Sequence, residues 1–92
     1  MNEGYGGFSN RETWIMALWA DNDEPRYRRY WEAYKALESE RGRESAVCRL
    51  AEIIRADVED HTPLQVGVYA DLLRAAIWRI NWREVAERFA DG

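Results

Sequence analysis

The sequence predicts an all-α fold: one compact domain of four main helices followed by a short C-terminal fifth helix. Two observations predict it. Three polar capping motifs stand where helices would begin, and four segments repeat apolar residues with the period of a helix. The chain has 92 residues, 47% of them apolar and 33% charged, which is typical of a single globular domain. We expect residues 1–8, which include three glycines, to form a flexible lead-in and residues 9–92 to form the domain.

The first helix is expected to begin at Ser9, because Ser9 and Glu12 fit the capping box in which each side chain bonds an amide of the first turn. The residues from Trp14 to Ala20 are apolar on nearly all sides of a helix, which favours a central position. The helix is expected to end within residues 21–23. At 100° per residue, one broad arc holds Trp14, Ile15, Leu18 and Trp19, and the other side holds Met16 and Ala20.

The second helix is expected to run from Pro25 to about Arg41, with Asp23 as its cap and Gly42 as its stop. The third helix is expected to span about residues 44–57. Both carry an apolar stripe at helical spacing. The stripes are Tyr27, Tyr30, Trp31, Tyr34 and Leu37 in the second helix, and Val47, Leu50, Ala51, Ile54 and Val58 in the third.

A capping box over residues 62–65, with Pro63 in the first turn, predicts the start of the fourth helix. Asn81 fits the cap of a short fifth helix, so a break is expected there. The apolar stripes are Val66, Tyr69, Ala70, Leu73, Ala76, Ile77 and Ile80 in the fourth helix, and Val85, Ala86 and Phe89 in the fifth. We expect the core to contain Trp14, Leu18, Trp31, Tyr34, Leu50, Ile54, Leu73 and Ile77.

Net charge and cysteine content narrow the function classes. A net charge of −4 argues against a protein that holds phosphate backbones on a positive face. The single cysteine excludes an intrachain disulfide and favours a reducing compartment. The chain has neither a membrane-spanning apolar segment nor the features of a signal peptide, so a cytoplasmic protein with no membrane partner is expected.

No motif for catalysis, cofactor binding or metal binding stands out. The acidic residues 21–24 lack the alternating oxygens, glycine turn and distal glutamate of a calcium loop, and capping explains them. His61 is the only histidine, which argues against a zinc site or a catalytic triad. We therefore expect a non-enzymatic protein with no catalytic residue, cofactor or metal.

Arginines alternate with aromatic residues from Arg26 to Tyr34, a pattern seen in proteins that bind nucleic acids. On a helical wheel the aromatic residues share one side, and Arg28 and Arg29 face away from it. A core stripe with solvated arginines explains the pattern better. A small nucleic-acid-binding accessory protein that uses Arg26, Arg28 and Arg29 stays as the alternative function.

Trp78 lies off the apolar stripe of the fourth helix, and Trp82 follows it one turn later. Two structural explanations are open: the fifth helix folds back over Trp78, or Arg74 stacks on its ring. The functional explanation is a partner-binding surface, because tryptophan and arginine are enriched at interface hot spots. The candidate surface consists of Trp78, Trp82, Arg74 and Asp71, with the acidic groups Asp21, Asp23, Glu24, Asp57, Glu59 and Asp60 at its rim.

Several short motifs resemble those of a family of small, uncharacterised proteins from phages, plasmids and prokaryotic genomes. The matching segments are residues 10–14 (Asn-Arg-Glu-Thr-Trp), 18–19 (Leu-Trp), 21–23 (Asp-Asn-Asp), 69–73 (Tyr-Ala-Asp-Leu-Leu) and 81–86 (Asn-Trp-Arg-Glu-Val-Ala). The family has Ile where this chain has Val85, and the resemblance does not cover residues 27–62. It implies a mobile-element origin, in which small acidic helical proteins often inhibit host or defence machinery, and it carries over no catalytic residue.

The leading hypothesis is therefore a protein-binding module that attaches to a host or defence protein, such as a CRISPR effector, and inhibits it. Its acidic groups would compete for a nucleic-acid groove on the target, because carboxylates can occupy phosphate sites. A homodimer closed by the second face of the first helix stays open.

Overall fold

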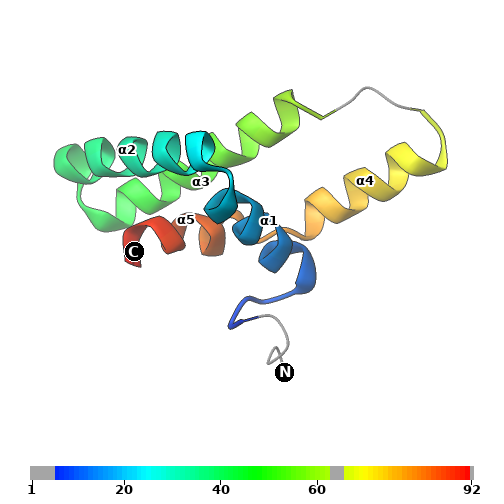
Figure 1. Ribbon diagram of the computed structural model, residues 1–92, viewed down its shortest axis with the longest axis horizontal. Coiled ribbons are helices and arrows are strands. Elements are labelled where there is room, and N and C mark those ends of the chain that lie inside the picture. The colour runs from blue at the N-terminus through cyan, green and yellow to red at the C-terminus, as the bar shows by residue number, and fades with distance from the viewer. Residues whose placement is uncertain (1–5, 63–65, 92) are drawn as a thin grey trace.

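The computed structural model describes residues 6–62 and 66–91, and every regular element within these ranges is a helix. Figure 1 shows the order: α1 (Arg11–Asn22), α2 (Glu24–Arg41), α3 (Arg43–Asp60), α4 (Val68–Arg79) and α5 (Trp82–Asp91). The all-α prediction is confirmed. α5 has 10 residues against 12 in α1 and α4, so a division into four main helices and a minor fifth stays a prediction.

α2 and α3 form an antiparallel hairpin whose only intervening residue is Gly42. Gly42 has a φ of 85°, a backbone conformation that other residues rarely adopt, and its amide donates to the carbonyl of Glu38 at 2.8 Å. The predicted stop is therefore confirmed. α3 extends three residues beyond its predicted end at Asp57, to Asp60. α5 packs along α3 under this hairpin (Figure 1).

The core lies where α1 and α5 meet the α2–α3 hairpin. Tyr34, Leu50 and Ile54 are buried there as predicted, whereas Leu18 and Trp31 are exposed and were wrongly placed in the core. Ile77 is only partly buried and packs at the edge of the core. The buried cluster consists of Met16, Ala20, Tyr30, Tyr34, Ala46, Val47, Leu50, Ile54, Trp82, Val85, Ala86 and Phe89.

The cap of α1 lies one residue later than the predicted cap, Ser9, and the helix begins at Arg11. Asn10 is its cap, and the Asn10 side chain accepts a hydrogen bond from the amide of Thr13 at 2.9 Å. Ser9 does not cap the helix, because its amide and its hydroxyl both donate to the carboxylate of Glu84 in α5. The local capping motif is replaced by a contact that joins the two ends of the fold.

The buried face of α1 is the one opposite to the predicted arc. Ile15, Leu18 and Trp19 are exposed, and Trp14 is only partly buried. The reason is side-chain size, since a face with two alanines lets α1 approach α2 and α5 closely, whereas the tryptophan-bearing arc would hold the helices apart. The buried residues of α1 are Thr13, Met16, Ala17 and Ala20.

α4 also begins later than predicted. The hydroxyl of Thr62 donates to the carbonyl of Val58 at 2.8 Å, so Thr62 bonds the last turn of α3, which ends at Asp60 with His61 as its cap. Residues 63–65 of the predicted capping box lie outside the described residues. α4 begins after Gly67, which has a φ of 94° and makes no side-chain cap.

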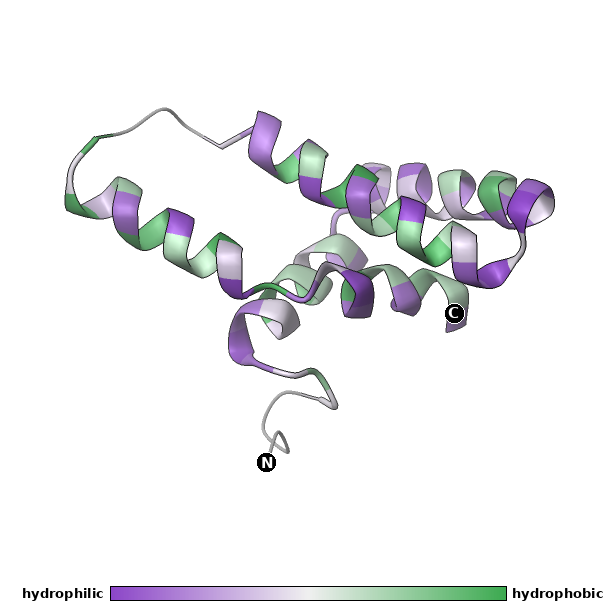
Figure 2. Cartoon of the chain, turned by 180° about the vertical axis from the view of Figure 1, so that it is seen from behind, coloured by the Kyte–Doolittle hydropathy of each residue, from purple (hydrophilic) through white to green (hydrophobic). Residues whose placement is uncertain are grey.

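α4 extends away from the hairpin and has α1 as its main neighbour (Figure 1). Ala70 is its only buried residue. Two residues predicted to be buried in this region, Val66 and Tyr69, are 94% and 75% exposed. In Figure 1, α1 lies beside the C-terminal end of α4 and not beside its start. Figure 2 shows, from behind, that hydrophobic and hydrophilic residues alternate along this helix. Within the described ranges, no helix combines the length and the hydropathy needed to cross a bilayer.

Candidate functional site

Trp78 and Trp82, predicted to share one surface, lie in different environments. Trp78 is 78% exposed, whereas Trp82 is 9% exposed and belongs to the core. The chain leaves the helical conformation at Ile80, with φ −69° and ψ 127°, so the one-turn spacing between the two rings does not continue across the break. Trp82 is therefore a structural residue, and only Trp78 is available to a partner.

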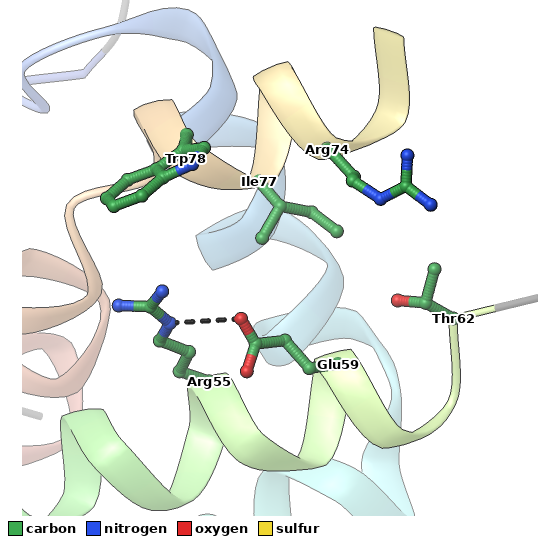
Figure 3. A pocket seen from close by; sticks show the side chains of 6 residues that line it. All are labelled: Arg55, Glu59, Thr62, Arg74, Ile77 and Trp78. Carbon is green, nitrogen blue, oxygen red and sulfur yellow. Dashed lines mark hydrogen bonds and ion pairs between the residues drawn. The ribbon is translucent and has the colours of Figure 1, made fainter. Parts of the chain in front are cut away.

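The ring of Trp78 faces α3. The guanidinium of Arg55 lies over it, 5.6 Å from the ring centre, a cation–π contact. Arg74, the stacking partner considered from the sequence, instead pairs with Asp71 at 3.3 Å. Arg55, Glu59, Thr62, Arg74, Ile77 and Trp78 line a hollow of about 290 Å³ between α3 and α4 (Figure 3).

A larger hollow of about 430 Å³ lies between α1, α4 and the end of α3. Thr62 and Ile77 line both hollows. We call the larger hollow the apolar groove. Its apolar walls are Ile15, Met16 and Trp19 from α1, Val58 from α3, and Leu73, Ala76, Ile77 and Ile80 from α4; its polar lining is Glu12, Arg26, His61 and Thr62.

Large apolar side chains are exposed mostly beside this groove and along α4. Among the described residues ten are exposed, and only two of them, Tyr27 and Trp31, belong to α2. The three rings outside α2 are 63% to 78% exposed, which leaves on the order of 400 Å² of aromatic surface in water. The eight side chains outside α2 are Ile15, Leu18, Trp19, Val66, Val68, Tyr69, Leu72 and Trp78. We call these eight side chains the apolar surface.

The predicted acidic rim does not form one cluster. Asp23 caps α2 by accepting from the amide of Arg26, and Asp60 is exposed at the end of α3. The other acidic groups each have a basic neighbour, so their charges are largely neutralised on site. The pairs are Asp21–Arg88, Glu24–Arg28, Asp57–Arg29, Glu59–Arg55 and Asp71–Arg74.

Asp57 is the most enclosed of these acidic groups. Burial alone would raise its pKa, but the hydrogen bond from the Tyr30 hydroxyl and the charge of Arg29, 2.7 Å away, lower it overall. For Tyr30, burial and the bond to Asp57 raise the pKa to about 12. His61 lies 3.3 Å from the same carboxylate. These contacts fasten α2 to the end of α3, so a structural role explains Asp57.

The three arginines of the nucleic-acid alternative do not share one face. Arg28 pairs with Glu24 and Arg29 pairs with Asp57, while Arg26 lines the apolar groove. Nucleic-acid binding needs several cations on one accessible face. The geometry therefore gives the alternative no support, and it stays a prediction.

Within the ranges that the structure describes, no three His, Cys, Asp or Glu side chains are placed to hold a metal ion. The search of protein-family models finds no match to the chain, and neither do the comparisons with curated proteins and with solved structures. The resemblance to the phage and plasmid family stays a prediction, and the function has to be argued from the apolar surface and the groove.

Proposed function

We propose that the protein is a non-enzymatic binding module that attaches to another protein through the apolar surface of α1 and α4. The observation that carries the proposal is the concentration of exposed apolar side chains on these two helices. Monomeric proteins rarely leave a large apolar surface in water unless a partner covers it. α4 supplies four of these eight side chains, and α1 is its main neighbour among the described helices.

The size of the surface supports binding. Burying ~400 Å² of aromatic surface alone would contribute about 10 kcal/mol at ~25 cal/mol per Å². That is large enough to offset much of the ~4–15 kcal/mol that association costs in lost freedom of motion. Tyr69 and Trp78 lie nine positions apart and thus about half a turn from each other around α4, so a partner that buries both rings has to reach around the helix.

The proposed target is a host or defence protein, with a CRISPR effector as one candidate, which the module inhibits by covering a working surface in the host cytoplasm. The resemblance to a phage and plasmid family supports this class of target. The net charge of −4 also supports it, because an acidic module is attracted to the basic grooves in which such proteins hold nucleic acids.

Capture and identification of the partner, followed by titration, tests the proposal. The tagged protein is used to capture proteins from a host lysate, and the candidate is then purified and titrated. Trp78→Ala and Tyr69→Ala should each weaken binding at least 30-fold, the loss expected when a hot-spot ring is removed. Trp31→Ala, a ring on α2, is the matched control and should keep the affinity. Unchanged affinity in both test variants would exclude the apolar surface as the binding site.

A binding assay with duplex DNA separates the alternative function from this one. At physiological salt we expect no affinity better than the ~10⁻⁴–10⁻⁶ M of non-specific contacts. Tighter binding that disappears in the Arg28→Ala, Arg29→Ala double variant would favour the nucleic-acid-binding protein instead.

A further inference from the structure

Arg26 is a charged residue of the apolar groove whose hydrogen-bonding needs are not met by the described part of the chain. It lies in the first turn of α2, and its side chain lines the groove. Its Nε is buried and has no hydrogen-bond partner there. A buried donor without an acceptor destabilises the protein, and it does so more strongly when the group is charged.

The acidic groups around the groove are already used. Asp57, whose pKa Arg26 helps to lower, is bonded to Tyr30 and to Arg29. Glu12, on the α1 side of the groove, pairs with Arg79 at 3.3 Å. Arg26 itself has no ion pair among the described residues. A carboxylate of a bound partner would therefore be able to form an ion pair with Arg26.

The walls of the groove favour a helix as the occupant. They are helical side chains, and the backbone groups behind them already bond within their own helices. An extended segment laid in such a groove would bury backbone amides and carbonyls without partners, whereas a helix satisfies its own. The apolar wall residues recur at helical spacing, Ile15 with Trp19 on α1 and Leu73 with Ile77 on α4, which suits the packing of a third helix between them.

We infer that the apolar groove binds an amphipathic helix of the partner protein, with the apolar side of that helix in the groove and one of its carboxylates paired with Arg26. The inference rests on the proposed binding function and names the chemistry of the partner. Grooves of this kind bind apolar side chains at positions i, i+3 or i+4, and i+7 of the bound helix. A two-pronged arginine–carboxylate bond would fix the direction in which that helix lies.

A second copy of this chain fits the groove less well. Its helix with a free apolar side is α4, where Val68, Leu72 and Ala75 share one exposed face. That face also carries Asp71, whose carboxylate already pairs with Arg74 at 3.3 Å, and it continues to Arg79, one turn after Ala75, so its carboxylate is engaged and it adds a cation. Like charges beside Arg26 would oppose the contact.

The test is selection from a displayed library of single amphipathic helices, run in parallel on immobilised wild-type protein and on the Arg26→Glu variant. Helices selected on the wild type should share the apolar spacing and carry Asp or Glu at one fixed position. Those selected on Arg26→Glu should carry Lys or Arg at that position. Failure to enrich any helix, or an acidic preference that survives Arg26→Glu, overturns the inference.

Titration of one selected helix, labelled with fluorescein, measures the pair itself. Arg26→Gln in the protein, or Gln for the acid in the peptide, should each weaken binding about tenfold, and the two together should weaken it little further because they remove the same interaction. Arg28→Gln, an exposed arginine on the same helix, is the matched control and should change nothing. Additive losses in the double variant would contradict direct pairing, and melting temperatures establish that each variant is folded.

Two further results separate this inference from the proposed function. If the natural partner needs Trp78 and Tyr69 but is not displaced by the selected helix, the groove inference fails and the binding function stands. If neither the partner nor the peptide depends on α1 or α4, both fail. Sedimentation of the free protein as a dimer that Trp19→Asp dissociates would assign the groove to a second copy instead.

Discussion

α4 and α5 follow each other along the chain and are similar in length, yet they differ sharply in burial. α5 buries four of its ten residues, and α4 buries one of its twelve. The difference does not come from apolar content, because α4 contains Val68, Tyr69, Leu72 and Trp78, all of them exposed. It comes from position: α5 lies against the α2–α3 hairpin, whereas α4 has α1 as its main neighbour.

The comparison separates apolar residues that are buried and stabilise the fold from apolar residues that stay exposed. In α5, Val85 and Ala86 are completely buried, and their contacts with α3 hold the fold together. In α4, equally apolar side chains meet water and add little to the free energy of unfolding. The exposed apolar residues of α4 are the basis of our proposal that a partner protein covers them.

The largest expected effect concerns α5, the helix of this comparison that packs in the core. Phe89 of α5 is buried and packs edge-on against Tyr30, with ring centres 5.8 Å apart. Phe89→Ala should lower the free energy of unfolding by about 3–5 kcal/mol, measured by urea denaturation. Leu72→Ala in α4 is the control and should cost less than about 1 kcal/mol. Similar losses for the two variants would remove the distinction between the helices.

A smaller effect is expected where α1 is fastened to the start of α5. The hydroxyl of the buried Thr13 accepts from the amide of Asn81 at 2.8 Å and donates to Asn10 at 2.7 Å. Thr13→Val should cost about 1–3 kcal/mol of stability, because it leaves the Asn81 amide without an acceptor. Thr13→Ser keeps the hydroxyl and should lose less. If Thr13→Val has a higher melting temperature than Thr13→Ser, this hydrogen bond does not hold α1 on α5.

Alkaline pH should lower the free energy of unfolding through the ionisation of Tyr30, a buried residue of α2. Because its pKa is raised to about 12 in the folded protein, from the usual 10, the folded state keeps the phenol proton longer than the unfolded state does. The stability that Tyr30 contributes is fully present below pH 10 and is lost as the pH rises through about 12. Urea midpoints across this window should fall for the wild type and fall less for Tyr30→Phe. The exposed Tyr69→Phe should follow the wild type, and an identical slope in Tyr30→Phe would contradict the assignment.

Local signals predicted most of the helix boundaries. The Asp23 cap, the Gly42 stop and the Asn81 cap are all present, because each depends on residues within one turn of the helix end. The signals failed where a distant or competing group took the capping side chain. Glu84 holds Ser9, and the carbonyl of Val58 accepts from Thr62.

The faces of the helices were harder to predict. α1 is apolar on almost every side, so periodicity could not say that the face with Ala17 and Ala20 is the one that packs. The position of Trp82 depends on the turn at Ile80, which redirects the chain. The exposure of Trp78 was suggested by its place off the apolar stripe. The apolar groove, with Arg26 as its cation, depends on how four helices meet, which no single segment encodes.

The most direct test compares Trp78→Ala with Trp82→Ala, two tryptophans four positions apart in the chain. Trp82→Ala should lower the free energy of unfolding by about 3–5 kcal/mol, since it removes a core ring, whereas Trp78→Ala should cost less than about 1 kcal/mol and still weaken partner binding at least 30-fold. Equal stability losses for the two variants, or full partner affinity in folded Trp78→Ala, would contradict the division of this protein into a core that stabilises the fold and a helix, α4, that binds the partner.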